Sequence, residues 1–198
     1  MDDDHATPPA IRPLRAHAQR NRDALIDAAY EAFTAGEADV RVEEIARRAG
    51  VGVGTFYRHF PTREAIIEAV YDGQVRDMCA SAPARLATEP PEDALRAFLE
   101  QLIQHAVDSR SMAVALKTLM DLGSPVFSRG REAMTDTIRQ LMAAGAAAGT
   151  IRADITADTV FRAMGGICAS HGQPGWENTA REVVRLLCDG LRPPALLS

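Results

Sequence analysis

The chain has 198 residues, of which 46% are hydrophobic and 25% are charged, and its formal net charge at pH 7 is −5. No apolar run is long enough to span a membrane, and the acidic first ten residues do not form a signal peptide. We therefore expect a cytoplasmic protein that does not contact membranes. Ala, Leu, Arg and Glu dominate and strand-like alternation is missing, so the sequence predicts an all-α fold.

The N-terminal third of the chain differs in character from the remainder. Residues 1–18 are rich in proline and are predicted to form a flexible tail. Residues 11–63 carry nine arginines against seven acids, a balance of +2, whereas residues 64–198 are net acidic. This weakly positive segment is therefore the part of the chain best suited to an anionic partner.

A short helix followed by a glycine turn is predicted within residues 41–52. Its apolar residues recur at helical spacing and give the helix one buried face; they are Val42, Ile45, Ala46 and Ala49. Gly50 and Gly52 then stop the helix, because glycine accepts the left-handed backbone of a tight turn. Arg47 and Arg48 are expected to lie on a solvated face, with binding of an anion as the alternative.

A second short helix is predicted from Val53 to about His59. Phe56 and Phe60 would be buried on one of its sides. The other side presents polar and aromatic groups, namely Thr55, Tyr57, Arg58 and His59. Two short helices at a steep angle, the second with such a face, indicate a helix-turn-helix that reads DNA.

The order of these residues resembles the DNA-binding domain of the tetracycline-repressor (TetR) family of bacterial transcription regulators. The resemblance covers roughly residues 20–70. Its matching positions are the first-helix run Arg22-Asp23-Ala24-Leu25-Ile26-Asp27-Ala28-Ala29 with Phe33, then Ile45-Ala46, Ala49-Gly50-Val51, Gly54-Thr55-Phe56-Tyr57-Arg58-His59-Phe60 and Arg63-Glu64. Gly52 departs from the usual Ser or Thr, and Arg63 from the usual Lys. Arg41 replaces a capping Thr; its guanidinium could contact a phosphate but cannot accept a hydrogen bond from the helix.

Each predicted DNA contact has its own chemistry. Tyr57 is expected to bond a phosphate, and Thr55 a phosphate or a thymine methyl group. His59 is left open between a DNA contact and a helix cap. Arg63 opens the next helix, where the dipole favours anions, and is predicted to clamp a phosphate. The predicted set is Arg41, Gly54, Thr55, Tyr57, Arg58, His59 and Arg63, while Arg12, Arg15 and Arg20 could trail onto the minor groove.

The remaining chain reads as a succession of amphipathic helices. Thr62 is predicted to cap a helix that joins the DNA-binding domain to a C-terminal domain. Further helices are expected at residues 91–107, at 112–122, from Ser124-Pro125 to Gly149, after Thr156, and from about Trp176 to Leu191. The predicted organisation is a tail at 1–18, a three-helix DNA-binding domain at 19–65, and a helical ligand-binding and dimerisation domain at 66–198.

The resemblance implies a homodimer in which the last two helices of each subunit form a four-helix bundle. The predicted interface residues are Gly165, Gly166, Val183, Val184, Leu187 and Leu191. Glycines in the penultimate helix would let two helices approach closely, although they could instead pack inside one subunit. A dimer would place two recognition helices one DNA turn apart, on a palindrome.

The resemblance also implies a small-molecule effector bound in the C-terminal domain. The Met and Phe residues there suit an adaptable apolar cavity and, equally, an ordinary core. His105 and Lys117 are the polar side chains expected to orient the ligand. The predicted lining residues are Met78, Phe98, Leu102, His105, Leu116, Lys117, Met120, Phe127, Met134, Phe161 and Met164.

Enzymatic chemistry finds no support in the motifs. The sequence contains no hydrolase, zinc-protease, phosphate-loop or dinucleotide pattern, so we expect no enzyme and no cofactor. Cys79, Cys168 and Cys188 lack metal-ligand spacing and are expected to be reduced, buried thiols, with a redox switch as the lesser alternative. His105 and His171 could meet as a metal-binding or acid–base pair, but no short spacing supports a metal site.

The sequence thus predicts a repressor that leaves a double-stranded DNA operator when a ligand binds. Within regulation, the alternatives are an activator and a ligand-independent DNA binder. Outside it, they are a helical interaction module without sequence-specific DNA affinity and a small-molecule-binding enzyme.

Overall fold

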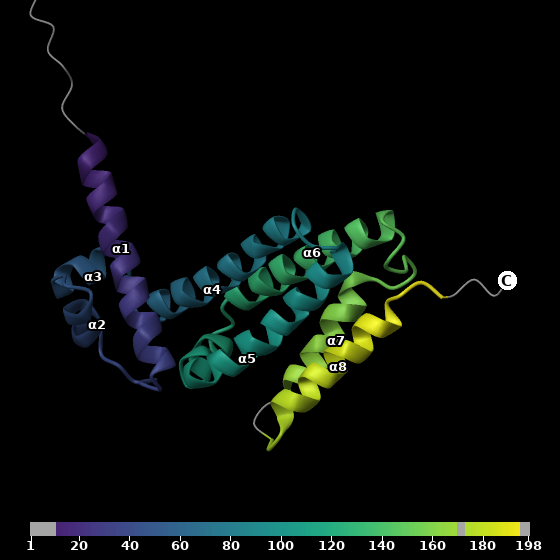
Figure 1. Ribbon diagram of the computed structural model, residues 1–198. Helices are drawn as coiled ribbons and strands as arrows, with labels where there is room; N and C mark the ends of the chain where they lie inside the picture. Colours follow the sequence, from purple (N-terminus) through teal and green to yellow (C-terminus); the bar gives the residue numbers. More distant parts are fainter. Residues whose placement is uncertain (1–10, 170–172, 195–198) are drawn as a thin grey trace, which may run out of the picture. The chain divides into compact units, whose positions relative to one another are not determined.

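The computed structural model describes residues 11–169 and 173–194, and these residues form eight helices and no strand (Figure 1). The helices are α1 (Ile11–Thr34), α2 (Val42–Arg48), α3 (Val53–His59), α4 (Arg63–Leu86), α5 (Pro91–Asp121), α6 (Val126–Ala147), α7 (Ala157–Ala169) and α8 (Trp176–Gly190). The all-α prediction is confirmed. In this part of the chain no helix combines the length and apolarity that a membrane crossing requires.

The chain divides into two compact units after Val70. We call residues 11–70 the head and residues 71–194 the body. The predicted boundary lay after residue 65, and it moves because the first turns of α4 group with the head. Of the predicted tail, residues 1–10 lie outside the described residues. Residues 11–18 belong to α1 instead of an irregular tail, since Pro13 falls in the first turn of the helix, where proline is tolerated.

The head is held together by the apolar faces of α1, α2 and α3. Leu25, Ala29 and Phe33 recur every four residues along α1 and are fully buried. Ile45 of α2 and Phe56 of α3 are 0% exposed and complete the core. The three helices pack on one another pairwise, so α3 has one fixed face and one free face.

The ends of several helices confirm the predicted signals. Gly50 has φ +68°, the left-handed conformation that ends α2. The Thr62 hydroxyl accepts a hydrogen bond from the Ala65 N–H at 3.2 Å, and the Thr156 hydroxyl accepts one from the Thr159 N–H at 3.2 Å. Arg41 occupies the N-cap of α2 without a side-chain hydrogen bond, as expected for a side chain that carries only donors.

In the body, α5 packs against α6 and α8, and α6 packs against α7. The prediction of two helices at 91–107 and 112–122 was wrong, because α5 runs without a break from Pro91 to Asp121. Its polar stretch at residues 108–111 contains neither glycine nor proline, and polar residues alone do not end a helix. Phe98, Leu99 and Ile103 lie on the buried side of α5.

Candidate nucleic-acid interface

Helix α3 presents the free face on which the predicted contacts lie. Phe56 and Phe60 are 0% and 3% exposed, with ring centroids 5.8 Å apart, and they anchor the helix to the head. Tyr57 is 50% exposed, although its ring packs on that of Phe56 in a T-shaped arrangement with the ring centroids 5.4 Å apart. Arg58 is exposed next to it. The hydroxyl and guanidinium of these two residues are therefore available to a partner.

The start of α3 is open. Thr55 and His59 are half-buried, while Gly54 is exposed. A Cβ added at Gly52 or Gly54 would meet no atom within 4 Å, so neither glycine is required by packing inside the head. Bare backbone at these positions would let a large surface approach α3 closely.

Arg41, at the N-cap of α2, points its charge into solvent. Its side chain is 84% exposed, and its Nε lies 3.7 Å from the Glu43 carboxylate. An exposed pair at this distance contributes little to stability, so a phosphate could displace Glu43 at low cost.

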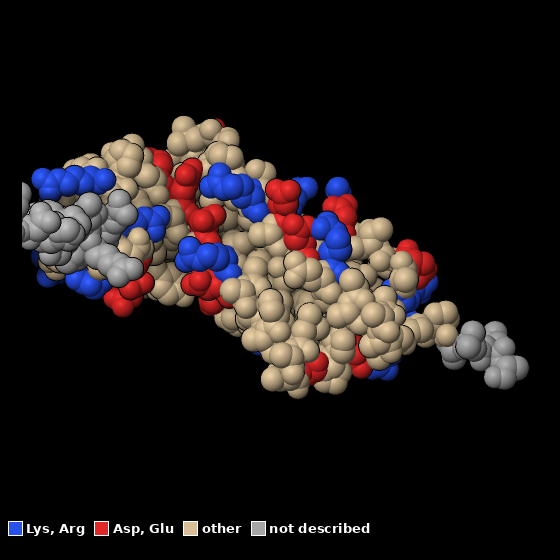
Figure 2. Space-filling model, turned by 90° about the horizontal axis from the view of Figure 1, so that it is seen from above, with Lys and Arg blue, Asp and Glu red and all other residues tan. Residues whose placement is uncertain are grey.

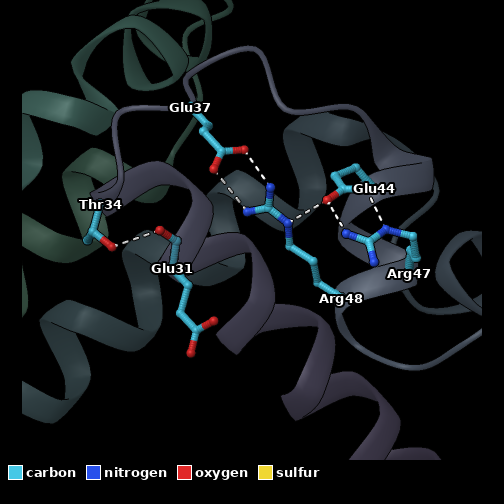
Figure 3. Close-up of polar contacts among 6 residues, drawn as sticks. All are labelled: Glu31, Thr34, Glu37, Glu44, Arg47 and Arg48. Carbon is cyan, nitrogen blue, oxygen red and sulfur yellow. Dashed lines mark hydrogen bonds and ion pairs between the residues drawn. The ribbon is translucent and has the colours of Figure 1, made fainter.

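Arg47 and Arg48 are engaged with carboxylates, as Figure 3 shows. Arg48 donates from both Nη atoms to Glu37 at 2.7 and 3.1 Å, and from Nε to Glu44 at 2.8 Å. Arg47 donates to both oxygens of Glu44 at 2.7 Å. The hydrogen bonds from Arg47 and Arg48 lower the pKa of Glu44 to about 2, and the hydrogen bonds to Glu37 and Glu44 raise the pKa of Arg48. The solvated face predicted for this helix is an ordered ion-pair network.

Arg63 differs from the predicted phosphate clamp. It is half-buried, and its guanidinium donates to two backbone carbonyls of the segment between α1 and α2: to Val40 at 3.4 Å and to Ala38. Arg22, which the sequence analysis did not single out, lies with its guanidinium carbon 5.3 Å from the centroid of the Phe60 ring. Both arginines contribute to the architecture of the head.

Over the body, the face seen in Figure 2 shows acidic and basic side chains interspersed, without a continuous basic band. The ion pairs follow the helices: Asp136 with Arg139, Asp158 with Arg162, and Glu177 with Arg181 are three or four residues apart. This face of the body therefore offers no continuous basic surface to an anionic partner.

The predicted dimer residues divide into two groups. Val184 and Leu191 are 0% and 5% exposed, so they belong to the core of one subunit, and their assignment to an interface was wrong. Gly165 and Gly166 are exposed, and an added Cβ would meet no atom within 4 Å. Val183 and Leu187 are half-buried, and Leu186, which was not predicted, is 70% exposed.

The predicted ligand residues also divide. Phe98, Leu102, Leu116, Met134 and Met164 are buried, and Met78 and Phe161 are half-buried. Lys117 is 71% exposed and pairs with Asp121, and Met120 is 64% exposed, so neither lines an enclosed site in this chain. Both residues lie in the last turns of α5, where their side chains are exposed.

The predicted His105 and Phe127 are joined by a residue that the sequence analysis missed. The Tyr71 ring lies 5.2 Å from that of Phe127 and 6.0 Å from that of His105, centroid to centroid. A Cβ added at Gly130 would lie 3.0 Å from the Tyr71 hydroxyl, so this glycine makes room for the ring. Burial raises the pKa of Tyr71 and lowers the pKa of His105. Both side chains therefore favour their neutral forms.

A separate cavity of about 280 Å³ lies among the start of α5, the turn after α6 and the end of α8. Arg96, Arg192, Glu92 and Cys188 contribute to its mixed lining. None of the predicted ligand residues takes part in it.

The three cysteines form no disulfide bond within the described part of the chain. Cys79, Cys168 and Cys188 are half-buried, and burial raises the pKa of each thiol. His171 lies outside the described residues, so its pairing with His105 stays a hypothesis. Among the residues that the structure describes, no three His, Cys, Asp or Glu side chains gather as a metal site would require.

Comparisons with known proteins agree with this geometry. Residues 25–70 match the model of bacterial regulatory proteins of the tetR family, and residues 90–193 match that of the SbtR-like C-terminal domain of transcriptional regulators. The transcriptional regulator SrpR of Pseudomonas putida is 42% identical over 60 residues, which cover 30% of this chain and only 28% of SrpR.

Solved structures extend the likeness to nearly the whole chain. The TetR regulator SCO0520 of Streptomyces coelicolor is 41% identical, with 88% of this chain and 99% of that chain covered and a TM-score of 0.73. A TetR regulatory protein of Mycobacterium vanbaalenii is 35% identical, with 91% and 100% covered and a TM-score of 0.68. Proteins of this kind regulate transcription and are not enzymes. With a helix-turn-helix in the head and family matches along both units, the chain belongs to the TetR family of DNA-binding transcriptional regulators.

Proposed function

We propose that this protein is a repressor that binds a palindromic operator as a homodimer and leaves it when a small molecule binds the body. The observation that carries the operator contact is the free face of α3, where Tyr57 is half exposed and Arg58 is exposed. Tyr57 would bond a phosphate and fix the register of α3, while Thr55 would read a phosphate or a thymine methyl group in the major groove. A cytoplasmic location follows from this proposal.

Dimerisation would multiply these contacts. Each head offers few unpaired arginines, because Arg47, Arg48 and Arg63 are bonded within it. Two linked heads give a second contact at high effective concentration, which offsets a weak single site. The exposed part of α7 and α8, with Gly165, Gly166 and Leu186, is the surface through which we expect two subunits to pair.

The proposed effector is an apolar or amphipathic molecule of modest size. The neutral aromatic group of Tyr71, His105 and Phe127 would stack on it and orient it by hydrogen bonds. Proteins with the same fold but about 20% identity support the capacity for ligands. Thermus thermophilus FadR was crystallised with lauroyl-CoA at 21% identity, and RolR with resorcinol at 18%.

The operator contact is tested by the double variant Thr55→Ala/Tyr57→Phe. Genome-wide selection with the purified wild-type protein supplies the operator, and fluorescence anisotropy at fixed salt measures affinity. We expect specific affinity to fall about tenfold or more, because two hydrogen bonds are removed. The matched control is Tyr30→Phe/Thr34→Ala, which removes two hydroxyls from exposed positions of α1 in the same head. Equal affinities of the two double variants would remove Thr55 and Tyr57 from the interface.

The effector is tested by a thermal-shift screen of metabolites and drugs, followed by operator-release assays on each hit. A true effector raises the melting temperature and releases DNA over one concentration range, because both effects come from one binding equilibrium. His105→Phe should weaken both effects for that molecule. Hits that stabilise the protein while leaving operator affinity unchanged would contradict coupling between the body and the head.

A further inference from the structure

The segment between α1 and α2, residues 35–41, is held from two sides. Arg48 of α2 donates two parallel hydrogen bonds of 2.7 and 3.1 Å to the carboxylate of Glu37, eleven residues earlier in the chain (Figure 3). From the start of α4, Arg63 donates to the carbonyls of Ala38 and Val40. The two arginines thus hold neighbouring points on one connection.

The chemistry of this connection requires such donors. Inside it, the Val40 N–H donates to the Glu37 carbonyl at 3.0 Å, which folds the backbone into a turn. The Ala38 and Val40 carbonyls accept hydrogen bonds from the guanidinium of Arg63, whose rigid fork can bond two acceptors at once. A lysine at this position would offer a single mobile charge in place of the fork.

The same connection leads directly into the DNA-reading elements. Arg41, the residue after Val40, is the N-cap of α2, and its carbonyl accepts the Glu44 and Ile45 N–H groups at 3.0 and 3.1 Å. Helix α2 in turn packs on α3. A shift of residues 38–40 would therefore move both the Arg41 guanidinium and the support of α3.

We propose that Arg48 and Arg63 are positioning residues, which orient Arg41 and α3 toward the operator through this connection and do not themselves bind phosphate. Ala38 is half-buried and Val40 is buried, so a phosphate that drew the Arg63 guanidinium away would leave the carbonyls of these two residues without their side-chain donor. Arg48 would have to give up three hydrogen bonds to two carboxylates. The proposal rests on the operator binding described above.

Salt dependence separates positioning from phosphate contact. The probes are the duplex selected by the wild-type protein and an unrelated duplex of equal length, each titrated at several NaCl concentrations. For Arg63→Gln we expect specific affinity to fall about tenfold or more, with an unchanged slope of log affinity against log salt. The matched control Arg58→Gln removes an exposed charge. It should make the negative slope shallower by about 0.9 for each phosphate that the variant no longer neutralises. A slope change of that size in Arg63→Gln would overturn the proposal.

The conservative variant Arg63→Lys gives a second discrimination. Lysine also binds phosphate and is the residue that the resembled family usually has here, so Arg63→Lys would keep much of the operator affinity if Arg63 bound phosphate. A positioning fork needs the guanidinium, so Arg63→Lys should lose most of the affinity that Arg63→Gln loses while binding the unrelated duplex as the wild type does. Full operator affinity in Arg63→Lys would overturn the proposal.

Hydrogen exchange tests the same contacts without DNA, so that failure of operator binding and failure of this proposal can be told apart. Arg63→Lys and Glu37→Gln should each accelerate amide exchange within residues 37–41, while the amides around Phe33 and Phe56 keep their protection. Arg76→Lys, on an exposed pair with Asp77 in the body, is the control and should change neither region. Unchanged exchange at 37–41 in both head variants would overturn the proposal even if the DNA results agreed.

Discussion

The head and the body hold their buried and partly buried side chains in place by different means. In the head, arginines bond carboxylates and backbone carbonyls, as Arg48 does with Glu37 and Arg63 does with Ala38. In the body, the aromatic rings of Tyr71, His105 and Phe127 contact one another, and Gly130 gives them room. Directional hydrogen bonds suit a surface that must match a fixed partner, whereas apolar packing suits a site whose occupant varies in shape.

The largest effect should come from a charge placed in the core of the body. Val184→Glu buries a carboxylate at a position that is 0% exposed, and we expect a loss of more than about 4 kcal/mol and collapse of the body fold. Leu186→Glu, at 70% exposure on the same helix, should keep the helical content and split the dimer. Circular dichroism and sedimentation velocity measure the two outcomes. A Leu186→Glu variant that sediments as an undiminished dimer would place the interface elsewhere.

A cavity created in the head should show that the head and the body lose their stability independently of each other. Phe56→Ala removes a fully buried ring and should cost about 3–5 kcal/mol in the head, with loss of operator binding. Phe98→Ala makes the matched change in the body, where the ring is also 0% exposed. Hydrogen exchange by segment should show reduced protection in the unit that carries the substitution. If both variants lose protection equally in both units, the head and body unfold as one.

Substitutions of Gly145 and Gly166 distinguish packing within one subunit from packing between two subunits. A Cβ at Gly145 would lie 2.3 Å from Cδ1 of Ile151, so Gly145→Ala should destabilise the body by about 1–3 kcal/mol. Gly166→Ala meets no atom within 4 Å and gains helix propensity, so the fold of one subunit should be unharmed. Urea unfolding measures stability, and sedimentation measures the dimer. Weaker dimerisation in Gly166→Ala would support a close helix approach there, whereas unchanged dimerisation would exclude it.

The body should respond to pH through His105. Burial lowers the pKa of His105 below 6.5, so the unfolded chain binds the proton more readily than the folded chain. The contribution to stability is therefore complete above pH 6.5 and is lost as pH falls below it. Urea unfolding between pH 8 and pH 5 should show this decline, and His105→Phe should reduce it. An unchanged pH dependence in His105→Phe would assign the effect to another group.

The head should respond to pH at a lower range and more weakly. Hydrogen bonds from Arg47 and Arg48 lower the pKa of Glu44 from 4.5 to about 2. Stability from this carboxylate is present above pH 4.5 and lost as pH falls toward 2. Because the network is exposed, salt should screen much of the effect. Hydrogen exchange in α2 against pH, with Glu44→Gln as the insensitive control, measures it. Identical profiles for the two proteins would contradict the role of Glu44.

Local sequence patterns predicted the helices of the head and the buried and exposed faces of α3, but they did not predict contacts between distant residues. Phe56 and Phe60 alternate with Tyr57 and Arg58 at helical spacing, so the buried and exposed faces of α3 follow from sequence. The position of the Arg63 side chain depends on hydrogen bonds to carbonyls more than twenty residues earlier in the chain. No local sequence pattern predicts these hydrogen bonds. The sequence signal that could have raised the question is the arginine itself, which stands where the resembled family usually has lysine.

In the body, the position of a side chain depended more than in the head on contacts between residues distant in sequence, so local patterns predicted it less well. The apolar stripe on α8 identified a helix with a buried side, but it did not tell whether its own subunit or a second one covers Val184. Likewise, Met120 follows a helical spacing that suggests a core, yet it lies near the end of α5, where little covers it. No local pattern singled out Tyr71, because the space for its ring depends on Gly130, nearly sixty residues further along the chain.

Lys117 has a practical consequence for studying this regulator. It is the one lysine of the sequence, and its amine is exposed on α5 beside Asp121. Amine-reactive dyes or cross-linkers used at mildly alkaline pH would therefore attach to a single side chain of the body, besides the chain's α-amino group, and leave every arginine of the head unmodified. A fluorophore at Lys117 could then report on effector binding to the body without any label on the DNA-binding head. Lys117→Arg would confirm the site of attachment by abolishing side-chain labelling.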